Sequence, residues 1–290
     1  MLSPHSACLF VMLYAASLTF LALPLPQQPP PASGAHTLLL PKRIVSGETA
    51  TLAVLDANGR LTPGVTVNFS NGDHLVTNTT GRALFVAPLN PGVIYASIAS
   101  RPTRVYATIL TPAEARSSSL QVSSAPRFAS LADRFELSGS GFCGDSDTNT
   151  LRVAGKLALV LASSPVSLVA LPPVELGPGP AMVEVACAKH SSSSFSITFL
   201  ELSLEADSSP MAPGEQRTLT VRVRGTSSNV GLEAHNLAPQ VADLTGGNPS
   251  RISSTGGAEN VGRFQLVGRQ RGKFLISIRL LPEPVRPRGS

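Results

Sequence analysis

The sequence predicts an all-β protein built of β-sandwiches in tandem, and three observations lead to this prediction. Short runs of alternating apolar and polar residues recur along the chain, which is the period of a half-buried strand. The runs are separated by turn-forming residues, and the chain's 24 glycines and 25 prolines, about one residue in six, disfavour long helices. Hydrophobic residues make up 42% and charged residues 14%, so the composition supplies a core and excludes disorder of the whole chain.

Residues 1–23 predict a signal peptide. From Ala7 to Leu23 the sequence is almost wholly apolar, long enough for a signal-peptide core and slightly short for a membrane span. Cleavage is expected near Ala22 or within residues 32–35, and the alternative is an uncleaved N-terminal anchor, the one segment expected to contact a membrane. Residues 24–35 form a Pro-rich linker, expected to be stiff and extended. The protein is therefore expected to be exported, to a periplasmic, cell-surface or extracellular location.

Residues 36–111 predict the first sandwich, with strands over 49–55 and 65–69. Turn and strand motifs follow one another in a fixed order: Gly47-Glu48, Asp56-Ala57-Asn58-Gly59, Pro63-Gly64-Val65-Thr66-Val67, Thr80-Gly81-Arg82-Ala83 and Pro91-Gly92-Val93. With these motifs, residues 44–110 resemble the bacterial immunoglobulin-like repeat of invasins and intimins. The resemblance implies a rigid, exported, non-catalytic module that acts as a spacer or in adhesion, and it implies a bacterial origin.

The serine-rich residues 112–125 are expected to form a linker, and residues 126–200 predict the second sandwich. Its motifs are Gly139-Ser140-Gly141-Phe142, Leu151-Arg152-Val153-Ala154-Gly155, Pro172, and Gly177-Pro178-Gly179 ahead of Val183-Glu184-Val185. They resemble the IPT/TIG immunoglobulin-like fold. The glycines beside Ser140 permit a tight bend, from which Phe142 is expected to turn back into the core. Members of this family occur in receptors, transcription factors and envelope proteins, so the resemblance predicts a fold and no single function.

Residues 201–282 predict a third immunoglobulin-like sandwich from alternation alone, over 202–206, 217–223, 230–234 and 274–280. The Gly- and Ser-rich segment 242–262 is expected to be a long loop, functional or mobile. Residues 283–290 are expected to form a basic tail. The predicted architecture is three tandem immunoglobulin-like β-sandwiches.

The cysteines predict one disulfide. Cys8 lies in the signal segment, which leaves Cys143 and Cys187 as a pair. In an oxidising compartment their disulfide closes a loop of about 45 residues and stabilises the fold by roughly 3 to 4 kcal/mol. The alternative is two unpaired buried thiols. Neither cysteine lies in a CxxC pair, so no metal site is predicted there.

Two spacings imitate ligand sites. A GxGxxG pattern lies at Gly139, Gly141 and Gly144. It is followed by the acidic, turn-forming residues 145–149 instead of a helix, so no dinucleotide cofactor is predicted. Asp145, Asp147 and Asn149 have the spacing that opens a calcium loop, but Thr150 and Lys156 stand where that loop needs Gly and Glu. A solvated turn is expected, with a weak calcium site in a β loop as the alternative.

No catalytic constellation is visible. The histidines after the signal segment are scattered over different units at positions 36, 74, 190 and 235, and no nucleophile elbow, HExxH or P-loop occurs. Glu201 and Glu205, two positions of one predicted strand, are expected to face solvent. The chain has no Trp, and Tyr95 and Tyr106 are expected to close the core or edge of the first sandwich, so a carbohydrate module that stacks sugars on aromatic rings is not favoured.

The largest charge imbalance lies near the C-terminus of the chain, whose formal net charge is +5. The residues expected to contact an anionic partner are Arg263, Arg269, Arg271, Lys273 and Arg279. The alternative is a solvated strand face. Without interleaved aromatic residues, nucleic acid is the weaker candidate partner.

The sequence therefore predicts a non-catalytic exported bacterial protein that serves adhesion, spacing or protein-partner binding at the cell envelope. The partner is expected to be a protein or an envelope polymer. The alternative is an envelope polysaccharide-binding protein or an accessory module of a carbohydrate-active system, with the basic face and segment 242–262 as its contact surface. An enzyme ranks third.

Overall fold

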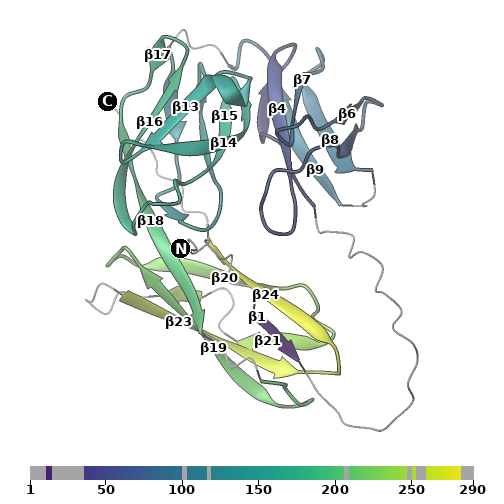
Figure 1. Cartoon of the computed structure of the whole chain (residues 1–290), viewed down its shortest axis with the longest axis vertical. Coiled ribbons are helices and arrows are strands. Elements are labelled where there is room, and N and C mark those ends of the chain that lie inside the picture. The colour runs from purple at the N-terminus through teal and green to yellow at the C-terminus, as the bar shows by residue number, and fades with distance from the viewer. Residues whose placement is uncertain are drawn as a thin grey trace.

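The protein is built of β-strands joined by turns, as the sequence predicts (Figure 1). The computed structural model describes residues 11–14, 36–99, 103–115, 119–205, 209–246, 250–252 and 259–281. Within these ranges the one helix is the short 3₁₀ turn Ser146–Thr148, and no helix there is long and apolar enough to cross a membrane. Cys8, the predicted cleavage sites, the Pro-rich linker 24–35 and the basic tail 283–290 lie outside the described residues.

Sandwich 1 consists of two sheets that enclose one core. The first sheet contains β2 (Thr37–Leu39), β4 (Thr49–Leu55) and β7 (Arg82–Val86). The second has the order β3 (Arg43–Val45), β9 (Arg104–Leu110), β8 (Gly92–Ile98), β5 (Thr66–Phe69), β6 (His74–Val76). Ile44, Leu52 and Val67 are fully buried between them. The predicted strands at 49–55 and 65–69 are confirmed, because their alternation places every second side chain in this core.

Sandwich 2 follows, and it includes part of the segment expected to be a linker. One sheet holds β10 (Gln121–Ser124), β12 (Phe135–Ser140), β15 (Ser167–Leu171) and β14 (Lys156–Ser164). The other holds β13 (Asn149–Val153), β16 (Gly179–Cys187), β17 (His190–Ser191), the first half of β18 (Phe195–Glu205) and β11 (Phe128–Ser130). Strand β10 lies within residues 112–125 and pairs with β12. Phe142 is buried in the core, as predicted.

Sandwich 3 is made of two further sheets. One sheet has the order second half of β18, β19 (Gln216–Arg224), β23 (Glu259–Gly268), β21 (Ala242–Gly246). The facing sheet has the order β1 (Val11–Tyr14), β24 (Lys273–Leu280), β20 (Val230–Asn236), β22 (Ser250–Ile252). Strand β1 belongs to the predicted signal segment and pairs antiparallel with β24. Phe264 and Leu232 are fully buried between the sheets.

The expectation of a long loop over residues 242–262 is wrong for the part that the structure describes. This part contains β21, β22 and the start of β23. Ala242 and Ile252 are buried in the core of sandwich 3, and Leu244 packs against it. Small and polar residues dominate the composition of the segment, but its few apolar side chains stand at core-facing positions, and these determine the strands.

Sandwiches 1 and 2 share an interface that includes backbone pairing. Thr51 of β4 pairs with Ser163 of β14. Around this bridge a second apolar cluster joins the two sandwiches: Leu39, Ala53, Leu55, Leu161, Ala162 and Val169. The Thr51 hydroxyl donates to the carbonyl of Gly144 at 2.8 Å and accepts from the Ser146 amide at 3.1 Å. Gly144 comes so close to β4 that a Cβ there would lie 2.0 Å from the Thr49 carbonyl oxygen.

A buried arginine fastens this interface. Arg82 of β7 is 7% exposed. Its Nη2 donates to the carbonyl of Val160 at 2.7 Å and its Nε to that of Leu161 at 3.3 Å, while Nη1 lies 3.1 Å from a carboxylate oxygen of Asp147. The register of β14 shifts between Val160 and Ala162, a β-bulge. A bulge locally interrupts the hydrogen bonds between strands and so leaves carbonyls without a partner in the sheet. Arg82 of sandwich 1 donates to two carbonyls at this bulge of sandwich 2, those of Val160 and Leu161.

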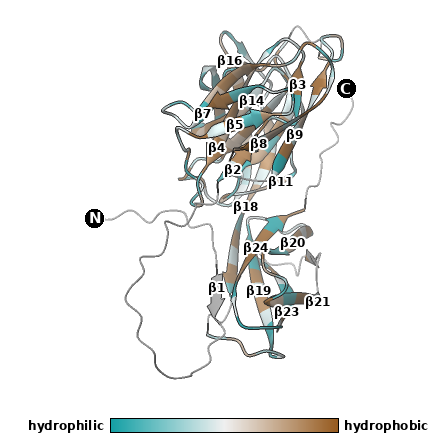
Figure 2. Ribbon diagram, turned by 90° about the vertical axis from the view of Figure 1, so that its right-hand side faces the viewer, coloured by the Kyte–Doolittle hydropathy of each residue, from teal (hydrophilic) through white to brown (hydrophobic). Residues whose placement is uncertain are grey.

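Sandwiches 2 and 3 are joined by a single continuous strand. The first half of β18 pairs with β16 through residue 199, and the second half pairs with β19 from residue 201 onward. Phe199 belongs to the core of sandwich 2 and Leu200 to that of sandwich 3. The strand passes from one to the other in Figure 2. Residues 200 and 201, where the second predicted sandwich ends and the third begins, thus lie in the middle of one strand.

Candidate binding face

The outer side of the β5–β8–β9 sheet in sandwich 1 is the candidate binding face. Along each strand, alternate residues enter the core, among them Val67, Ile94 and Ala107. The residues between them point outward, and we call the following five the tyrosine face: Asn68, Tyr95, Ser97, Arg104 and Tyr106. Sandwich 2 contacts sandwich 1 through β4, through Arg82 of β7 and at the β3 edge, where the Ser164 hydroxyl donates to the Arg43 carbonyl. Strands β6 and β8 lie on the side away from β14 and β15 (Figure 1), and the outer side of the sheet at Tyr95 and Tyr106 stays exposed.

Tyr95 and Tyr106 form an exposed aromatic pair. They lie opposite each other in the antiparallel register of β8 and β9, with ring centroids 6.3 Å apart and ring planes at 54°. Their exposed fractions are 45% and 62%. The prediction that they close the core or edge is wrong, because Ile94, Ala96 and Ala107 already occupy the core-facing positions. The alternation of Val93–Ile98 contained this information, since adjacent residues of a strand face opposite sides.

A polar row lies beside the aromatic pair. Asn68 of β5 is opposite Ser97 of β8, which is opposite Arg104 of β9. Together with Tyr95 and Ser70, these side chains border a shallow cavity of about 350 Å³. The Ser70 hydroxyl accepts from the Tyr95 amide at 3.1 Å, and the Ser70 amide donates to the Tyr95 carbonyl at 2.9 Å. These bonds fasten the turn after β5 against β8, so the rim of the cavity is held in place.

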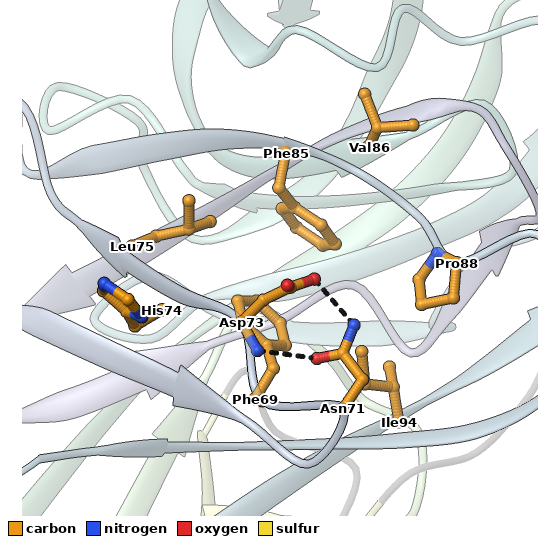
Figure 3. Close-up of a pocket in the computed structure, with 10 residues that line it drawn as sticks. Phe69, Asn71, Asp73, His74, Leu75, Phe85, Val86, Pro88 and Ile94 are labelled. Atoms are coloured by element: carbon orange, nitrogen blue, oxygen red, sulfur yellow. Dashed lines mark hydrogen bonds between the residues drawn. The ribbon is translucent and has the colours of Figure 1, made fainter.

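A second hollow opens between the edge strands β6 and β7 (Figure 3). It has a volume of about 340 Å³, and Phe69 and Phe85, with ring centroids 5.1 Å apart, form part of its wall. Asn71 donates from Nδ2 to the Asp73 carboxylate at 2.6 Å and accepts from the Asp73 amide at 3.2 Å. Because Phe69 lines both hollows, they flank the same β5–β6 turn. The described residues thus offer two recesses around one rigid turn.

The residues that imitate cofactor and calcium sites have structural roles. The Asp145 carboxylate accepts from the Asp147 amide and caps the 3₁₀ turn, and Asp147 pairs with Arg82. The Asn149 side chain accepts a hydrogen bond from the Cys143 amide through Oδ1 and donates one to the Cys143 carbonyl through Nδ2. No cluster of three His, Cys, Asp or Glu suited to a metal ion occurs in the described part of the chain.

The three glycines of the GxGxxG pattern fit close backbone contacts. A Cβ at Gly139 would lie 2.0 Å from the Gln121 carbonyl oxygen, and one at Gly141, whose φ is +72°, would lie 2.8 Å from Leu120. Gly144 has the contact with β4 described above. The pattern therefore serves the packing of β10, β12 and β4.

Cys143 and Cys187 form a disulfide, with Cα atoms 5.6 Å apart. The bond links the loop after β12 to the end of β16. Glu201 and Glu205 face solvent as predicted, and their carboxylates lie 3.9 Å from Arg224 Nη1 and 2.5 Å from Arg222 Nε. These glutamates are thus members of a surface ion-pair row on β18 and β19.

The five basic residues expected to contact an anionic partner are spread over sandwich 3. Arg263 is exposed on the outer side of β23, and Arg279 is exposed on the outer side of β24, which belongs to the facing sheet. Arg269, Arg271 and Lys273 lie at the β23–β24 turn, where Arg269 pairs with Asp243 at 2.8 Å. The structure therefore brings three of the five together, at one end of the sandwich.

No family model matches the chain, and no curated protein matches it. The solved structures that resemble it include the mixed-linkage glucan utilization locus protein SGBP-B of Bacteroides ovatus, in complex with a mixed-linkage heptasaccharide, with 13% identity over 88% of this chain and 75% of that chain and a TM-score of 0.31. Domains 4 and 5 of the S-layer protein SbsC are 16% identical over 51% of this chain and 78% of that one, with a TM-score of 0.22. The plexin A4 extracellular region is 9% identical over 86% of this chain and 32% of that one, with a TM-score of 0.31.

Proposed function

We propose that the protein is a non-catalytic, exported binding protein of the bacterial cell envelope and that the tyrosine face contacts its partner. The observation that carries this proposal is the exposure of Tyr95 and Tyr106 on the outer side of the β5–β8–β9 sheet. Aromatic side chains are enriched at binding hot spots because they bury a large area with few rotatable bonds. Covering both rings removes apolar surface from water and so favours association.

The rigid attachment of sandwich 1 to sandwich 2 supports the proposal that the tyrosine face is held in place for a partner. Arg82 and the β4–β14 bridge hold sandwich 1 on sandwich 2, and β18 continues into sandwich 3. A face held by a rigid support loses little conformational freedom when a partner binds, which raises affinity. A rigid support suits adhesion, the capture of an envelope polymer and spacing alike, and the exposed aromatic pair favours the two binding roles.

The disulfide supports the exported location. Bonds such as Cys143–Cys187 persist in oxidising compartments and are rare in the reducing cytosol. The resemblance of residues 44–110 to the repeats of invasins and intimins adds the bacterial envelope as the setting.

Retention on envelope material tests the proposal. The purified protein is co-sedimented with envelope fractions of its host, and the wild type is compared with the Tyr95→Ala/Tyr106→Ala variant. The matched control is Leu157→Ala/Val174→Ala, which removes two other exposed apolar side chains, 63% and 82% exposed, from sandwich 2. We expect the tyrosine variant to lose retention and the control to keep it. Equal retention of both variants contradicts the proposal.

The basic turn of sandwich 3 is the second candidate contact, because it gathers Arg269, Arg271 and Lys273 at one exposed end. A contact made by these charges weakens steeply with salt, whereas a contact made by aromatic stacking does not. Retention lost in Arg269→Gln/Arg271→Gln/Lys273→Gln and kept in the tyrosine variant assigns the contact to sandwich 3.

A further inference from the structure

The tyrosine face combines stacking surfaces with hydrogen-bonding groups in two adjacent rows. The aromatic row is Tyr95 and Tyr106, and the polar row is Asn68, Ser97 and Arg104. The rows are two residues apart along β8 and β9, which corresponds to about 7 Å. Side chains at such diagonal positions reach one another. One ligand is therefore able to touch both rows at once.

This combination fits sugar rings. The C–H groups on one face of a pyranose carry slight positive charge, and the face of an aromatic ring is negative, so the two attract when they stack. The hydroxyls at the edge of the same sugar need partners, which Asn68 and Ser97 supply as an amide and a hydroxyl. A protein ligand would instead favour a dry apolar centre, and here the polar row lies directly beside the rings.

The spacing and tilt of the rings indicate the form of the ligand. The centroids of Tyr95 and Tyr106 are 6.3 Å apart, more than the width of one pyranose, so a chain of at least two sugars is needed to cover both. The ring planes meet at 54°, which suits a chain whose successive sugars are turned against each other. A flat crystalline surface, such as that of cellulose, does not match this tilt.

The charge of the face indicates acidic sugars. Arg104 is exposed, and none of the ion pairs found among the described residues involves it. The outward positions of β5, β8 and β9 carry no acidic residue. A guanidinium binds a carboxylate through two parallel hydrogen bonds, which are stronger than bonds between neutral groups. A carboxylate on the sugar chain thus gives Arg104 the partner that the face itself lacks.

We propose that the tyrosine face binds a single, twisted polysaccharide chain that carries carboxylate groups, with Tyr95 and Tyr106 stacking on sugars and Arg104 pairing with a carboxylate. This inference rests on the proposed function, since it names the ligand class of the same face.

Affinity gel electrophoresis of the full chain tests the ligand class. The probes are polygalacturonate, alginate and hyaluronan as acidic polysaccharides, methyl-esterified polygalacturonate as the same sugar chain without charge, and poly-L-glutamate as carboxylates without sugar rings. We expect retardation by at least one acidic polysaccharide, at least tenfold weaker binding of its uncharged form, and no retardation by poly-L-glutamate. Absence of retardation by all three acidic polysaccharides overturns the proposal, and so does equal retardation by poly-L-glutamate.

Variants assign the contact to the face. Arg104→Gln is expected to weaken binding of the acidic chain about tenfold or more, the loss of a charged hydrogen-bonded pair, and to leave binding of the uncharged chain unchanged. Tyr95→Ala/Tyr106→Ala is expected to abolish both, whereas Tyr95→Phe/Tyr106→Phe keeps most of the binding because the rings remain. Leu157→Ala/Val174→Ala serves as the control. Wild-type binding by the Ala double variant overturns the proposal.

The outcomes separate this inference from the proposed function. If binding to the polysaccharides fails while envelope retention still depends on Tyr95 and Tyr106, the proposed ligand class is wrong and the binding role of the face stands. If envelope retention is also independent of the tyrosines, both are overturned.

Discussion

Replacing Arg82 with Ala should loosen sandwich 1 from sandwich 2. The change removes two hydrogen bonds from a charged donor, at 2.7 and 3.3 Å, and leaves the carbonyls of Val160 and Leu161 facing an empty space. Such bonds contribute roughly 1.5–3 kcal/mol each, and the longer one is at the low end. The pair with Asp147 adds little, since that carboxylate is 61% exposed. The expected loss in free energy of unfolding is about 3–4.5 kcal/mol.

Urea unfolding of the purified protein, followed by circular dichroism, measures this loss as a lower midpoint. Limited proteolysis adds a local measurement, because loosening should expose the chain between the sandwiches to cleavage while their cores stay protected. Arg60→Ala is the matched control, since Arg60 is exposed in the turn after β4. Arg82→Lys should recover only part of the loss, because an ammonium cannot reproduce the fork of the guanidinium. An Arg82→Ala midpoint equal to that of Arg60→Ala would refute the role assigned to Arg82.

Three further predictions concern stability and protonation. Gly144→Ala places a Cβ 2.0 Å from a backbone oxygen of β4, so it should cost about 1–3 kcal/mol in urea unfolding, while Gly177→Ala, with open space around it, should cost far less. Reduction of Cys143–Cys187 should lower the free energy of unfolding by roughly 3–4 kcal/mol, and an unchanged urea midpoint under reductant contradicts this. The amide and hydroxyl of Thr111 donate to Glu114 and lower its pKa below the ordinary 4.5. The turn they form is therefore stabilised above pH 4.5 and loses this contribution as the pH falls through the lowered pKa. An NMR titration should give a midpoint below 4.5 that moves only part of the way back toward it in Thr111→Ala, because alanine removes the hydroxyl donor and keeps the backbone amide.

The alternation of apolar and polar residues predicted those strands that have one side in the core and the other side in solvent. The expected runs at 217–223 and 274–280 correspond to β19 and β24, because in both strands alternate side chains enter one core and the others meet solvent. The sandwich class and the disulfide partners were predictable for similar local reasons: turn residues and cysteine count are visible in a single sequence.

The interface between sandwiches 1 and 2 could not be predicted, because two non-adjacent strands create it. Residues 50–55 of β4 and 160–164 of β14 are buried continuously, without alternation, since each strand has a core on one side and the other sandwich on the opposite side. A continuous apolar run is the sequence signal of such a strand, but it does not say what covers the second face. Arg82 likewise looks like any other strand arginine until the β14 bulge supplies its carbonyl partners.

The candidate binding face was missed for a different reason. The sequence predicts that Tyr95 and Tyr106 close the core or edge of sandwich 1, while their position in the alternation places them on its outer side. Their partnership with Asn68 and Arg104 depends on the pairing order β9–β8–β5, which no local pattern contains.

The continuous strand β18 determines how the protein bears tension. Its first half is held by β16 and its second half by β19, through backbone hydrogen bonds perpendicular to the strand. A pull that separates sandwich 3 from sandwich 2 acts along the strand and loads the bonds of each ladder together, in shear. Neither sandwich gives up β18 without losing a strand of its own sheet. A load taken up at the tyrosine face is therefore transmitted through Arg82 and β18 to the far end of the molecule without passing through a flexible joint.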